Sequence, residues 1–374
     1  MSPAQQPDPT SGARPGTGVG AHAERKDEHV RLAMSLHEPG KQTPWADVGF
    51  LHHALPGTDV DAVDLSTTVL GSRWQAPVYV NAMTGGTEAT GRLNAGLAEA
   101  AGAAGLAIAS GSQHVALRDA SREDTFTVIR RQAPQAFVLA NVGPTVSPEQ
   151  AARAVEMLQA DALQVHVNVA QEVPMPEGDR DFSGWAERIG AITEAVGVPV
   201  VVKEVGFGLS RRSVDQLVPL GVAAVDVAGN GGTDFVAIET SRRQDGAYRD
   251  LVGWGQSAAL CLLECLHTQA GELPVQVLAS GAVRTPLDVV RGLALGARAV
   301  GASGHFMRTL TESGPEALFR ELVSWKEQLR GIMALLGAGR VAELARTDLL
   351  VTGATAERAR LLGVDLGALA RRSS

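Results

Sequence analysis

The chain has 374 residues, enough for one large α/β domain with additions or for two domains of average size. It is 45% hydrophobic and 20% charged, as in ordinary globular proteins, and its net charge of −8 argues against general electrostatic attraction to nucleic acid or to an anionic membrane. An anionic ligand would therefore need a local cluster of groups or a metal ion. Because neither a signal peptide nor an apolar run of transmembrane length is found, we expect a cytoplasmic protein that does not bind membranes.

The beginning of the chain differs in composition from the rest. Residues 1–24 are rich in Pro, Gly, Ala, Ser and Gln and predict a disordered tail, whereas residues 25–374 predict a single domain. Arg25, Lys26 and His29 fall within two helical turns, either as the solvated start of a helix or as a cationic clamp for an anion. Residues 48–70 then alternate around a Leu-Pro-Gly turn and predict an extra hairpin before the main fold.

Short β-rich runs then alternate with Ala-rich amphipathic segments. The candidate strands are residues 78–81, 107–109, 137–141, 163–167, 200–203, 224–227, 275–279 and 299–301. Helical segments separate them, including residues 91–104, 148–160, 183–196, 257–269 and 286–295. Cys261 and Cys265 lie four residues apart in one of these segments, and we expect them to pack within a helix rather than form a disulfide or bind zinc.

Eight β-α units favour a closed TIM (β/α)8 barrel over an open doubly wound sheet. We expect the barrel core to span about 77–310 and a helical C-terminal segment, about 314–374, to cover one side. Each candidate strand ends in a polar or glycine-rich phrase, and such ends of parallel strands meet at one mouth of a barrel. In order, the phrases are NAMTGGT (81–87), SGSQH (110–114), NVGPT (141–145), HVNVAQE (166–172), KEVGFG (203–208), GNGGTD (229–234), SGAVR (280–284) and GASGHF (301–306).

The phrase after the fourth strand carries the most polar groups. Alternation places Gln164, His166 and Asn168 on one side of that strand, and Gln171 and Glu172 continue the polar series into the loop. Such side chains either form hydrogen bonds inside a core or face a substrate. A single carboxylate such as Glu172, completed by water and substrate phosphate, is a common way to hold Mg²⁺.

Two other phrases suggest cofactor chemistry. Lys203 ends an apolar strand, where an ammonium group suits either a Schiff base or the electron-rich edge of a flavin. In barrels a phosphate commonly lies between the loops after the last two strands, where Gly281, Gly301 and Gly304 would let the backbone approach an anion; the GGT run at 231–233 could add amides and a hydroxyl. No GxGxxG motif follows the first strand, so a Rossmann dinucleotide site is not indicated.

Taken in order, these phrases resemble those of the type 2, FMN-dependent isopentenyl diphosphate delta-isomerases. The resemblance covers residue 25 to about residue 371. It rests on RKDEH (25–29), MTGG (83–86), GSQ (111–113), QVHVNVAQE (164–172), EGDR (177–180), KEVGFG (203–208) and GGTDF (231–235).

The resemblance implies a TIM barrel that uses reduced FMN, NADPH as reductant and Mg²⁺, and that works as a homotetramer or homo-octamer. It implies catalytic roles for Gln171, His166 and Asn168 and a metal-binding role for Glu172. The implied substrate-binding residues are Arg25, Lys26, His29, Ser112, Gln113, His114 and Gln171. The implied FMN-binding residues are Ala82, Met83, Thr84, Ser112, Asn141, Lys203, Thr233, Gly281, Ala282, Val283, Ala302 and Ser303.

The sequence departs from the family pattern at two positions. His114 stands where the family usually has Arg, so diphosphate binding there is expected to be weaker or pH-dependent. Ala282 replaces a glycine, and we expect the phosphate site to survive only if this residue has a negative φ.

Three rival interpretations remain open. An FMN-dependent 2-hydroxy-acid oxidase or dehydrogenase would need a histidine base in a late loop, which GNGGTD and SGAVR lack. A metal-free lyase would form a Schiff base on Lys203. A flavin-binding protein without catalytic activity would leave Gln171 and Glu172 unused.

Overall fold

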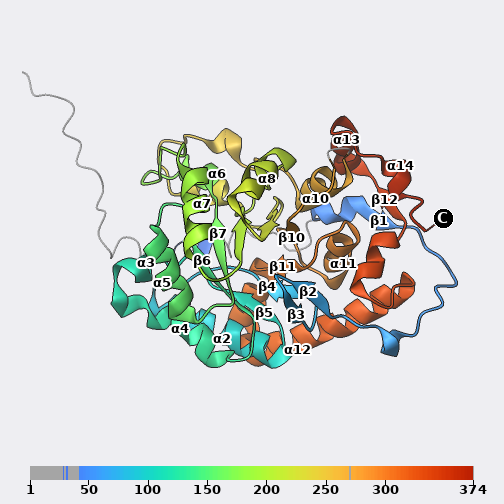
Figure 1. Ribbon diagram of the computed structural model, residues 1–374, viewed down its shortest axis with the longest axis horizontal. Coiled ribbons are helices and arrows are strands. Elements are labelled where there is room, and N and C mark those ends of the chain that lie inside the picture. The colour runs from blue at the N-terminus through green and yellow to red at the C-terminus, as the bar shows by residue number, and fades with distance from the viewer. Residues whose placement is uncertain (1–27, 29–30, 33–41, 269–270, 374) are drawn as a thin grey trace, which may run out of the picture.

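The computed structural model describes residues 28, 31–32, 42–268 and 271–373 (Figure 1). Eight parallel strands close into a barrel in the order β10-β11-β4-β5-β6-β7-β8-β9. They are β4 (Val78–Val80), β5 (Ala107–Ala109), β6 (Val138–Val142), β7 (Ala162–His166), β8 (Val200–Lys203), β9 (Ala224–Asp226), β10 (Gln276–Ser280) and β11 (Val300–Ala302). The predicted TIM barrel is therefore confirmed. The predicted tail, together with Arg25, Lys26 and His29, lies outside the described residues.

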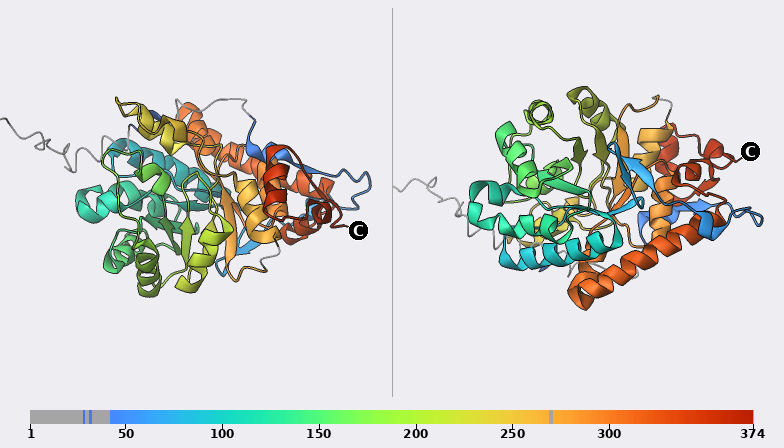
Figure 2. Two further views of the ribbon diagram at one scale, coloured as in Figure 1. Left: turned by 90° about the horizontal axis from the view of Figure 1, so that it is seen from above. Right: turned by 60° about the horizontal axis from the view of Figure 1, so that its bottom comes forward.

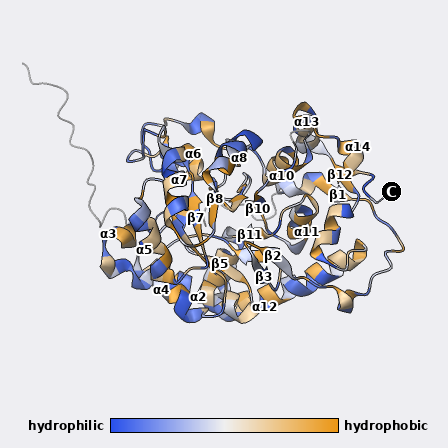
Figure 3. Ribbon diagram, in the orientation of Figure 1, coloured by the Kyte–Doolittle hydropathy of each residue, from blue (hydrophilic) through white to orange (hydrophobic). Residues whose placement is uncertain are grey.

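The strands are apolar on both faces because both faces are covered. Side chains such as Leu139 and Val201 fill the inside of the barrel, whereas Val200 and Val202 on the same strand as Val201 face the surrounding helices. The strands are accordingly coloured as hydrophobic in Figure 3, while the helices carry both colours. Because both faces of each strand are buried, polar side chains are expected mainly at the strand ends.

A hairpin closes one end of the barrel. It consists of β2 (Thr67–Val69) and β3 (Ser72–Trp74), joined through Leu70 and Gly71, which both have positive φ, as in the favoured two-residue hairpin turns. Trp74 packs against Tyr79 and Phe137 at the beginnings of β4 and β6, with ring centroids 5.6 and 5.2 Å away. The N-terminal end of the barrel is thus plugged, and ligands must enter at the carboxyl ends of the strands.

Helices surround the barrel and also lie in its loops. Those around the strands are α2 (Glu88–Ala104), α4 (Asp124–Gln132), α5 (Pro148–Leu158), α7 (Trp185–Ala195), α8 (Arg211–Leu217), α10 (Ala258–His267) and α11 (Pro286–Ala294). Short helices at the mouth are α3 (His114–Arg118), α6 (Val169–Glu172) and α9 (Phe235–Ser241). Cys261 and Cys265 are fully buried free thiols in α10, as the sequence predicted. None of the helices within the described ranges is long and apolar enough to cross a membrane.

The longest helix, α12 (Gly304–Leu335), follows the last barrel strand and runs beside α2 (Figure 2). Gly314 interrupts it with φ 83° and ψ 174°, and Pro315 starts the second part. Helical turn η6 (Val341–Arg346), strand β12 (Leu349–Val351) and helices α13 (Gly353–Leu361) and α14 (Leu366–Leu369) complete the chain. The C-terminal segment is thus mainly helical, as predicted, but it also contains a strand.

Strand β12 pairs with β1 (Val48–Phe50), so the two ends of the described chain form one small antiparallel sheet. The prediction of a hairpin within residues 48–70 is therefore wrong for β1, whose partner is Leu349–Val351, and the real hairpin spans residues 67–74. Asp47, at the end of helical turn η1 (Pro44–Asp47), reinforces this sheet by accepting hydrogen bonds from the Thr355 N–H and hydroxyl at 3.1 and 2.7 Å.

The remaining helical turns are η2 (Val60–Ala62), η3 (Ala120–Arg122), η4 (Val218–Leu220) and η5 (Arg249–Leu251). Turn η1 contacts the barrel mouth at the loop that follows β10. Its Trp45 is 1% exposed and donates an indole hydrogen bond to the Gly281 carbonyl at 3.0 Å. The β1–β12 sheet therefore holds the loop that follows β10.

Candidate active site

A cavity of about 1500 Å³ lies at the carboxyl ends of the barrel strands. The strand-end phrases converge on it, as expected for the mouth of a TIM barrel. Of the residues implied by the resemblance, those that line it are Ala82, Met83, Thr84, Ser112, His114, Asn141, His166, Asn168, Gln171, Glu172, Lys203, Thr233, Gly281, Ala282, Val283, Ala302 and Ser303. The structure therefore brings these predicted residues together around one cavity.

Gln113 is the exception among the described candidates. Its side chain is fully buried, donates to the Ala154 carbonyl at 2.9 Å and accepts from the Asn141 backbone N–H at 2.9 Å. Because both ends of the amide are used within the fold, Gln113 does not line the cavity. Its predicted substrate contact is corrected to a structural role that fixes the end of β6.

The turn from β7 into α6 brings four predicted residues together. The Asn168 amide donates to Gln171 Oε1 at 3.3 Å and to Glu172 Oε1 at 2.8 Å. His166, at the end of β7, makes a 2.9 Å hydrogen bond through Nδ1 to Asn141 Oδ1. The polar series therefore lines the cavity and is fixed by its own hydrogen bonds, and its contact with a substrate stays a prediction.

The EGDR phrase (177–180) forms hydrogen bonds with Glu172. Glu172 Oε2 accepts from the Asp179 backbone N–H at 2.8 Å, and the Arg180 guanidinium donates to the Glu172 and Met175 carbonyls, each at 2.7 Å. A side chain at Gly178 would place its Cβ 2.2 Å from the Glu172 carbonyl oxygen, so the loop can fold back only with glycine there. This part of the motif orients the carboxylate.

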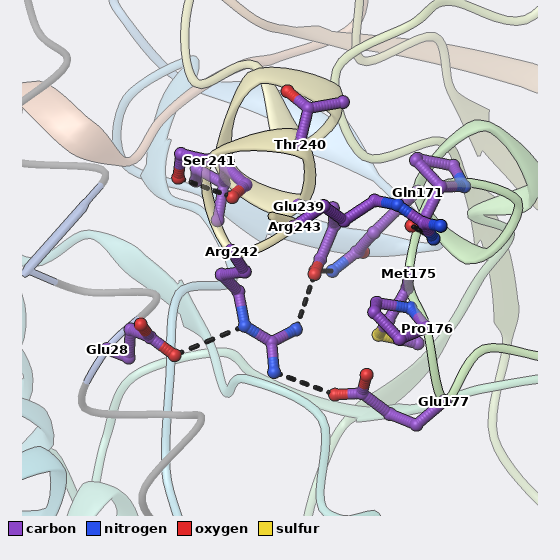
Figure 4. A network of polar contacts seen from close by, with 12 residues as sticks. Glu28, Gln171, Met175, Pro176, Glu177, Glu239, Thr240, Ser241, Arg242 and Arg243 are labelled. Carbon is purple, nitrogen blue, oxygen red and sulfur yellow. Dashed lines mark hydrogen bonds and ion pairs between the residues drawn. The ribbon is translucent and has the colours of Figure 1, made fainter. Parts of the chain in front are cut away.

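Gln171 also contacts a buried carboxylate that the sequence reasoning missed. Its Nε2 donates to Glu239 Oε1 at 3.2 Å (Figure 4). Glu239 is fully buried on α9 and is paired with Arg242, which also binds Glu177 and Glu28. The signal was a glutamate within the otherwise apolar start of FVAIETS. This network connects α6, α9 and the described residue 28 of the N-terminal region around one guanidinium.

A second carboxylate that was missed, Asp226 at the end of β9, lies inside the barrel and does not line the cavity. It is fully buried and accepts hydrogen bonds from the Tyr79 hydroxyl at 2.8 Å and the Ser280 hydroxyl at 2.9 Å. Burial, followed by the neighbouring Asp226, raises the pKa of Tyr79 well above its usual value, so the phenol remains a donor. The only charged residue in the run GVAAVDVAG was the available signal.

Lys203 lies beside Asp226 in the register of β8 and β9. Its ammonium group donates to the Glu204 carbonyl at 2.7 Å, and burial lowers its pKa, opposed by the charges of Asp226 and Glu204. Glu204 Oε2 accepts from three successive backbone N–H groups, those of residues 205–207, at 2.6–2.8 Å. Burial nevertheless raises the pKa of Glu204 to about 7, because desolvation outweighs these hydrogen bonds.

The loops after β10 and β11 form a backbone-lined recess where α12 begins. Gly281 has φ 97°, and a Cβ there would lie 2.0 Å from the Gly229 carbonyl oxygen, so the loops after β9 and β10 touch through backbone. Ala282 has φ 58°, which contradicts the negative φ that we expected to be required. The loop therefore takes the left-handed conformation despite the methyl group, at a cost of roughly 1–2 kcal/mol.

Gly301 lines the cavity, and a second constraint also requires glycine at this position. A Cβ at this position would lie 2.6 Å from Tyr79 Cζ, so the glycine makes room for an aromatic ring within the barrel. Gly304 begins α12. A Cβ at this position would have Thr233 Oγ1, at 3.8 Å, as its nearest neighbour. An anion at this recess would meet the first turn of α12 and the backbone of residues 281–283.

The described residues fit FMN and, more narrowly, Mg²⁺. Thr84 is 2% exposed and its hydroxyl has no hydrogen-bond partner, as expected for a group that contacts a ligand at the cavity wall. Within the described ranges no three His, Cys, Asp or Glu side chains gather to hold a metal ion. Mg²⁺ would therefore be held by Glu172 only together with substrate oxygens and water.

The fold and site define the class to which this chain belongs, that of barrels in the FMN-dependent dehydrogenase family, which matches residues 115–351. Solved structures share the fold: a lactate oxidase of Pediococcus acidilactici aligns with a TM-score of 0.65 at 15% identity over 90% of this chain and 94% of its own. A mandelate oxidase aligns with a TM-score of 0.60 at 19% identity over 87% and 91%. At these identities they show the fold alone.

Much closer relatives give the particular family. The chain is 50% identical to the isopentenyl-diphosphate delta-isomerase of Streptomyces sp. strain CL190 over 353 residues, 94% of this chain and 96% of the relative. It is equally similar to that of Kitasatospora griseola, with the same identity and coverage, and 47% identical to that of Nocardia farcinica over 93% and 96%. The chain belongs to the isopentenyl-diphosphate delta-isomerase family, as its motifs implied.

Proposed function

We propose that the protein interconverts isopentenyl and dimethylallyl diphosphates, with FMN bound in the barrel mouth. The observation that carries the proposal is the convergence of Asn168, Gln171 and Glu172 on the cavity from one turn, across from the recess formed by residues 281–283 and the start of α12. One side of the site is thus polar and fixed, while the other suits a phosphate.

Moving a double bond by one carbon requires a proton to be added at one carbon and another removed nearby. The described residues that line the cavity do not offer an obvious pair of strong acid and base for an apolar substrate, whereas a reduced flavin supplies proton exchange and an electron-rich ring. The residues of the chain would then position and shield. Gln171, held by Asn168 and Glu239, would face the reacting carbons, and Lys203 would lie against the flavin ring.

The diphosphate would be bound by His114, Ser112 and His166 with the help of Mg²⁺ on Glu172. All four residues line the cavity, and the two oxygens of Glu172 are oriented by Asn168 and Asp179. Arg25, Lys26 and His29 would add positive charge from the N-terminal segment. NADPH as the reductant, the tetrameric or octameric assembly and the cytoplasmic location remain predictions from the sequence resemblance.

An anaerobic assay tests the proposal. Purified protein is incubated with isopentenyl diphosphate, FMN and Mg²⁺, with and without dithionite or NADPH. We expect dimethylallyl diphosphate only when the flavin is reduced. If FMN binds but reduction yields no product, the isomerase proposal fails and the oxidase must be reconsidered.

The oxidase remains the alternative on fold alone. A 2-hydroxy-acid oxidase needs a histidine base near the flavin, but the described loops after β9 and β10 contain none within residues 227–235 and 281–285. His267 on α10 is bound to the Leu295 carbonyl at 2.8 Å and does not line the cavity. Reduction of bound flavin by lactate or mandelate would support the oxidase, and we expect none.

The Schiff-base lyase rests on the lowered pKa of Lys203, which is a property of lysine nucleophiles. The ammonium group, however, lies next to Asp226 and donates to a backbone carbonyl, as expected for a fixed positive charge. Borohydride trapping of substrate on Lys203 would support a lyase, and yellow protein with bound FMN would count against it.

A further inference from the structure

A continuous chain of side-chain hydrogen bonds runs through the buried interior of the barrel from Asp226 to His166, which lines the cavity. Asn81 Nδ2 donates to Asp226 Oδ2 at 2.9 Å, and Gln164 Nε2 donates to Asn81 Oδ1 at 3.2 Å. Asn141 Nδ2 then donates to Gln164 Oε1 at 3.1 Å, and Asn141 Oδ1 lies 2.9 Å from His166 Nδ1. The chain thus joins β9, β4, β7 and β6.

The direction of this chain is fixed at one end. The Asp226 carboxylate lies among donors: it also accepts from the Tyr79 and Ser280 hydroxyls and from the Ala228 backbone N–H at 3.1 Å. Asn81 must therefore turn its amide nitrogen toward Asp226. The Ala82 backbone N–H, which can only donate, lies 2.8 Å from Asn81 Oδ1 and agrees with this orientation.

The orientation of each side-chain amide determines the orientation of the next one in the chain. Because Asn81 presents oxygen, Gln164 must present its NH2 group, which leaves Gln164 Oε1 for the NH2 of Asn141. Asn141 therefore has only its oxygen left for His166. An oxygen acceptor at Nδ1 requires that this nitrogen carries the proton.

We infer that Asp226 is a positioning residue that sets the tautomer of His166 through Asn81, Gln164 and Asn141. In the neutral ring the proton lies on Nδ1, and Nε2 is an acceptor. Nε2 lies on the side of Gly143, whose Cβ, if present, would be 3.3 Å away, and both residues line the cavity. Buried amides that are all satisfied in one direction suit this role, because reversing any one of them would leave facing pairs of donors or acceptors.

The tautomer of His166 does not depend on any ligand, whereas the contact that His166 would make with a diphosphate substrate rests on the proposed function. A neutral His166 would offer Nε2 as an acceptor to a ligand O–H or N–H, and it could donate to a phosphate oxygen only after gaining a second proton. In the neutral ring of His166, a second proton would therefore be gained at Nε2 and not at Nδ1.

Nitrogen NMR of the FMN-free protein tests the inference without any activity measurement. The protein is labelled with ¹⁵N-histidine, and the His166 signals are assigned by their loss in His166→Gln. At alkaline pH, where histidine side chains are neutral, we expect the chemical shifts of the Nδ1–H tautomer. The Nε2–H tautomer in the unmodified protein would overturn the inference, whether or not the protein is an isomerase.

Two variants test the chain itself. Gln164→Leu interrupts it while keeping Asp226, and Asp226→Asn removes the fixed acceptor end; in whichever folds, we expect both His166 tautomers to be populated. Asp288→Asn is the matched control, because Asp288 is a buried carboxylate that caps α11 outside the chain. An Nδ1–H ring that persists in a folded Asp226→Asn protein or in Gln164→Leu, or an equal change in Asp288→Asn, would show that Asp226 does not set the tautomer through this chain.

Discussion

At the scale of single residues, Gln171 and Glu172 are neighbours with separate predicted roles. We expect Gln171→Ala mainly to lower turnover, because its amide would face the reacting carbons. Glu172→Gln retains an oxygen for Asn168 but loses negative charge, so we expect it mainly to raise the Mg²⁺ concentration required. Steady-state assays over a range of Mg²⁺ concentrations measure both effects, and equal small effects on turnover and metal dependence would contradict this division.

Ala282 is a strained residue at the proposed phosphate recess. Its φ of 58° favours glycine, so we expect Ala282→Gly to raise the free energy of unfolding by about 1 kcal/mol. Denaturant titration measures the change. Ala297→Gly serves as the control, because this buried alanine lacks a positive φ and its replacement should destabilise the protein by roughly 0.5–1 kcal/mol or more. A loss of stability in both variants would argue against strain at residue 282.

Glu204 makes stability depend on pH in a defined range. The unfolded chain releases this proton near pH 4.5, whereas the folded protein holds it up to about 7. Folding therefore binds a proton, and the contribution of Glu204 to the free energy of unfolding falls as pH rises from about 4.5 to about 7, by about 3 kcal/mol at most.

Glu204→Gln should remove this fall, since the amide oxygen can still accept the backbone N–H groups of residues 205–207. Denaturant titrations of the FMN-free proteins across that pH range measure it. Parallel stability curves for the two proteins would contradict a raised pKa for Glu204.

The positions of single residues at the cavity were predictable from the sequence where a polar group ends an apolar strand. His166 and Lys203 were found in this way, and both line the cavity. Asp226 was missed because it is a single charged residue between apolar neighbours, and its use depends on Tyr79 of β4 and Ser280 of β10. The substrate contact predicted for Gln113 was wrong, because the GSQ motif does not show in which direction the side chain points.

At the scale of elements, the pairing of β1 with β12 supports the loop after β10 through Trp45. Trp45→Phe keeps an aromatic ring but removes the donor to the Gly281 carbonyl. A lost hydrogen bond of about 1 kcal/mol should raise the dissociation constant for FMN about fivefold. Fluorescence titration of the FMN-free protein measures this constant.

Trp74→Phe is the matched control, because Trp74 is also buried but its indole N–H has no partner. We expect its FMN dissociation constant to stay near that of the unmodified protein. The same constant in all three proteins would show that η1 does not support the cofactor recess.

The barrel strands and the helices between them were predictable because their signals are local. Each strand is a short apolar run, and α5 and α11 begin with Ser147 and Thr285 followed by proline, a common helix start. The β1–β12 pairing was not predictable, because register between segments about 300 residues apart leaves no periodic trace in either segment.

At the scale of the whole molecule, cofactor binding should stabilise the folded chain. FMN at one hundred times its dissociation constant should add about 2.7 kcal/mol to the free energy of unfolding. Riboflavin lacks the phosphate of FMN. Thermal denaturation with each ligand therefore distinguishes the stabilisation contributed by phosphate binding from that contributed by the flavin ring. We expect a smaller rise in melting temperature with riboflavin, and equal rises would argue against phosphate binding at residues 281–283.

The sheet between β1 and β12 also sets a time order during synthesis. The ribosome releases residues 48–50 and all eight barrel strands before residues 349–351 exist, at about 5–20 residues per second. Until then η1 lacks the strand that holds it, and Trp45 is not yet fixed against Gly281. A nascent barrel can therefore close several seconds before its cofactor loop is secured, so loading with flavin belongs to the end of translation or after it.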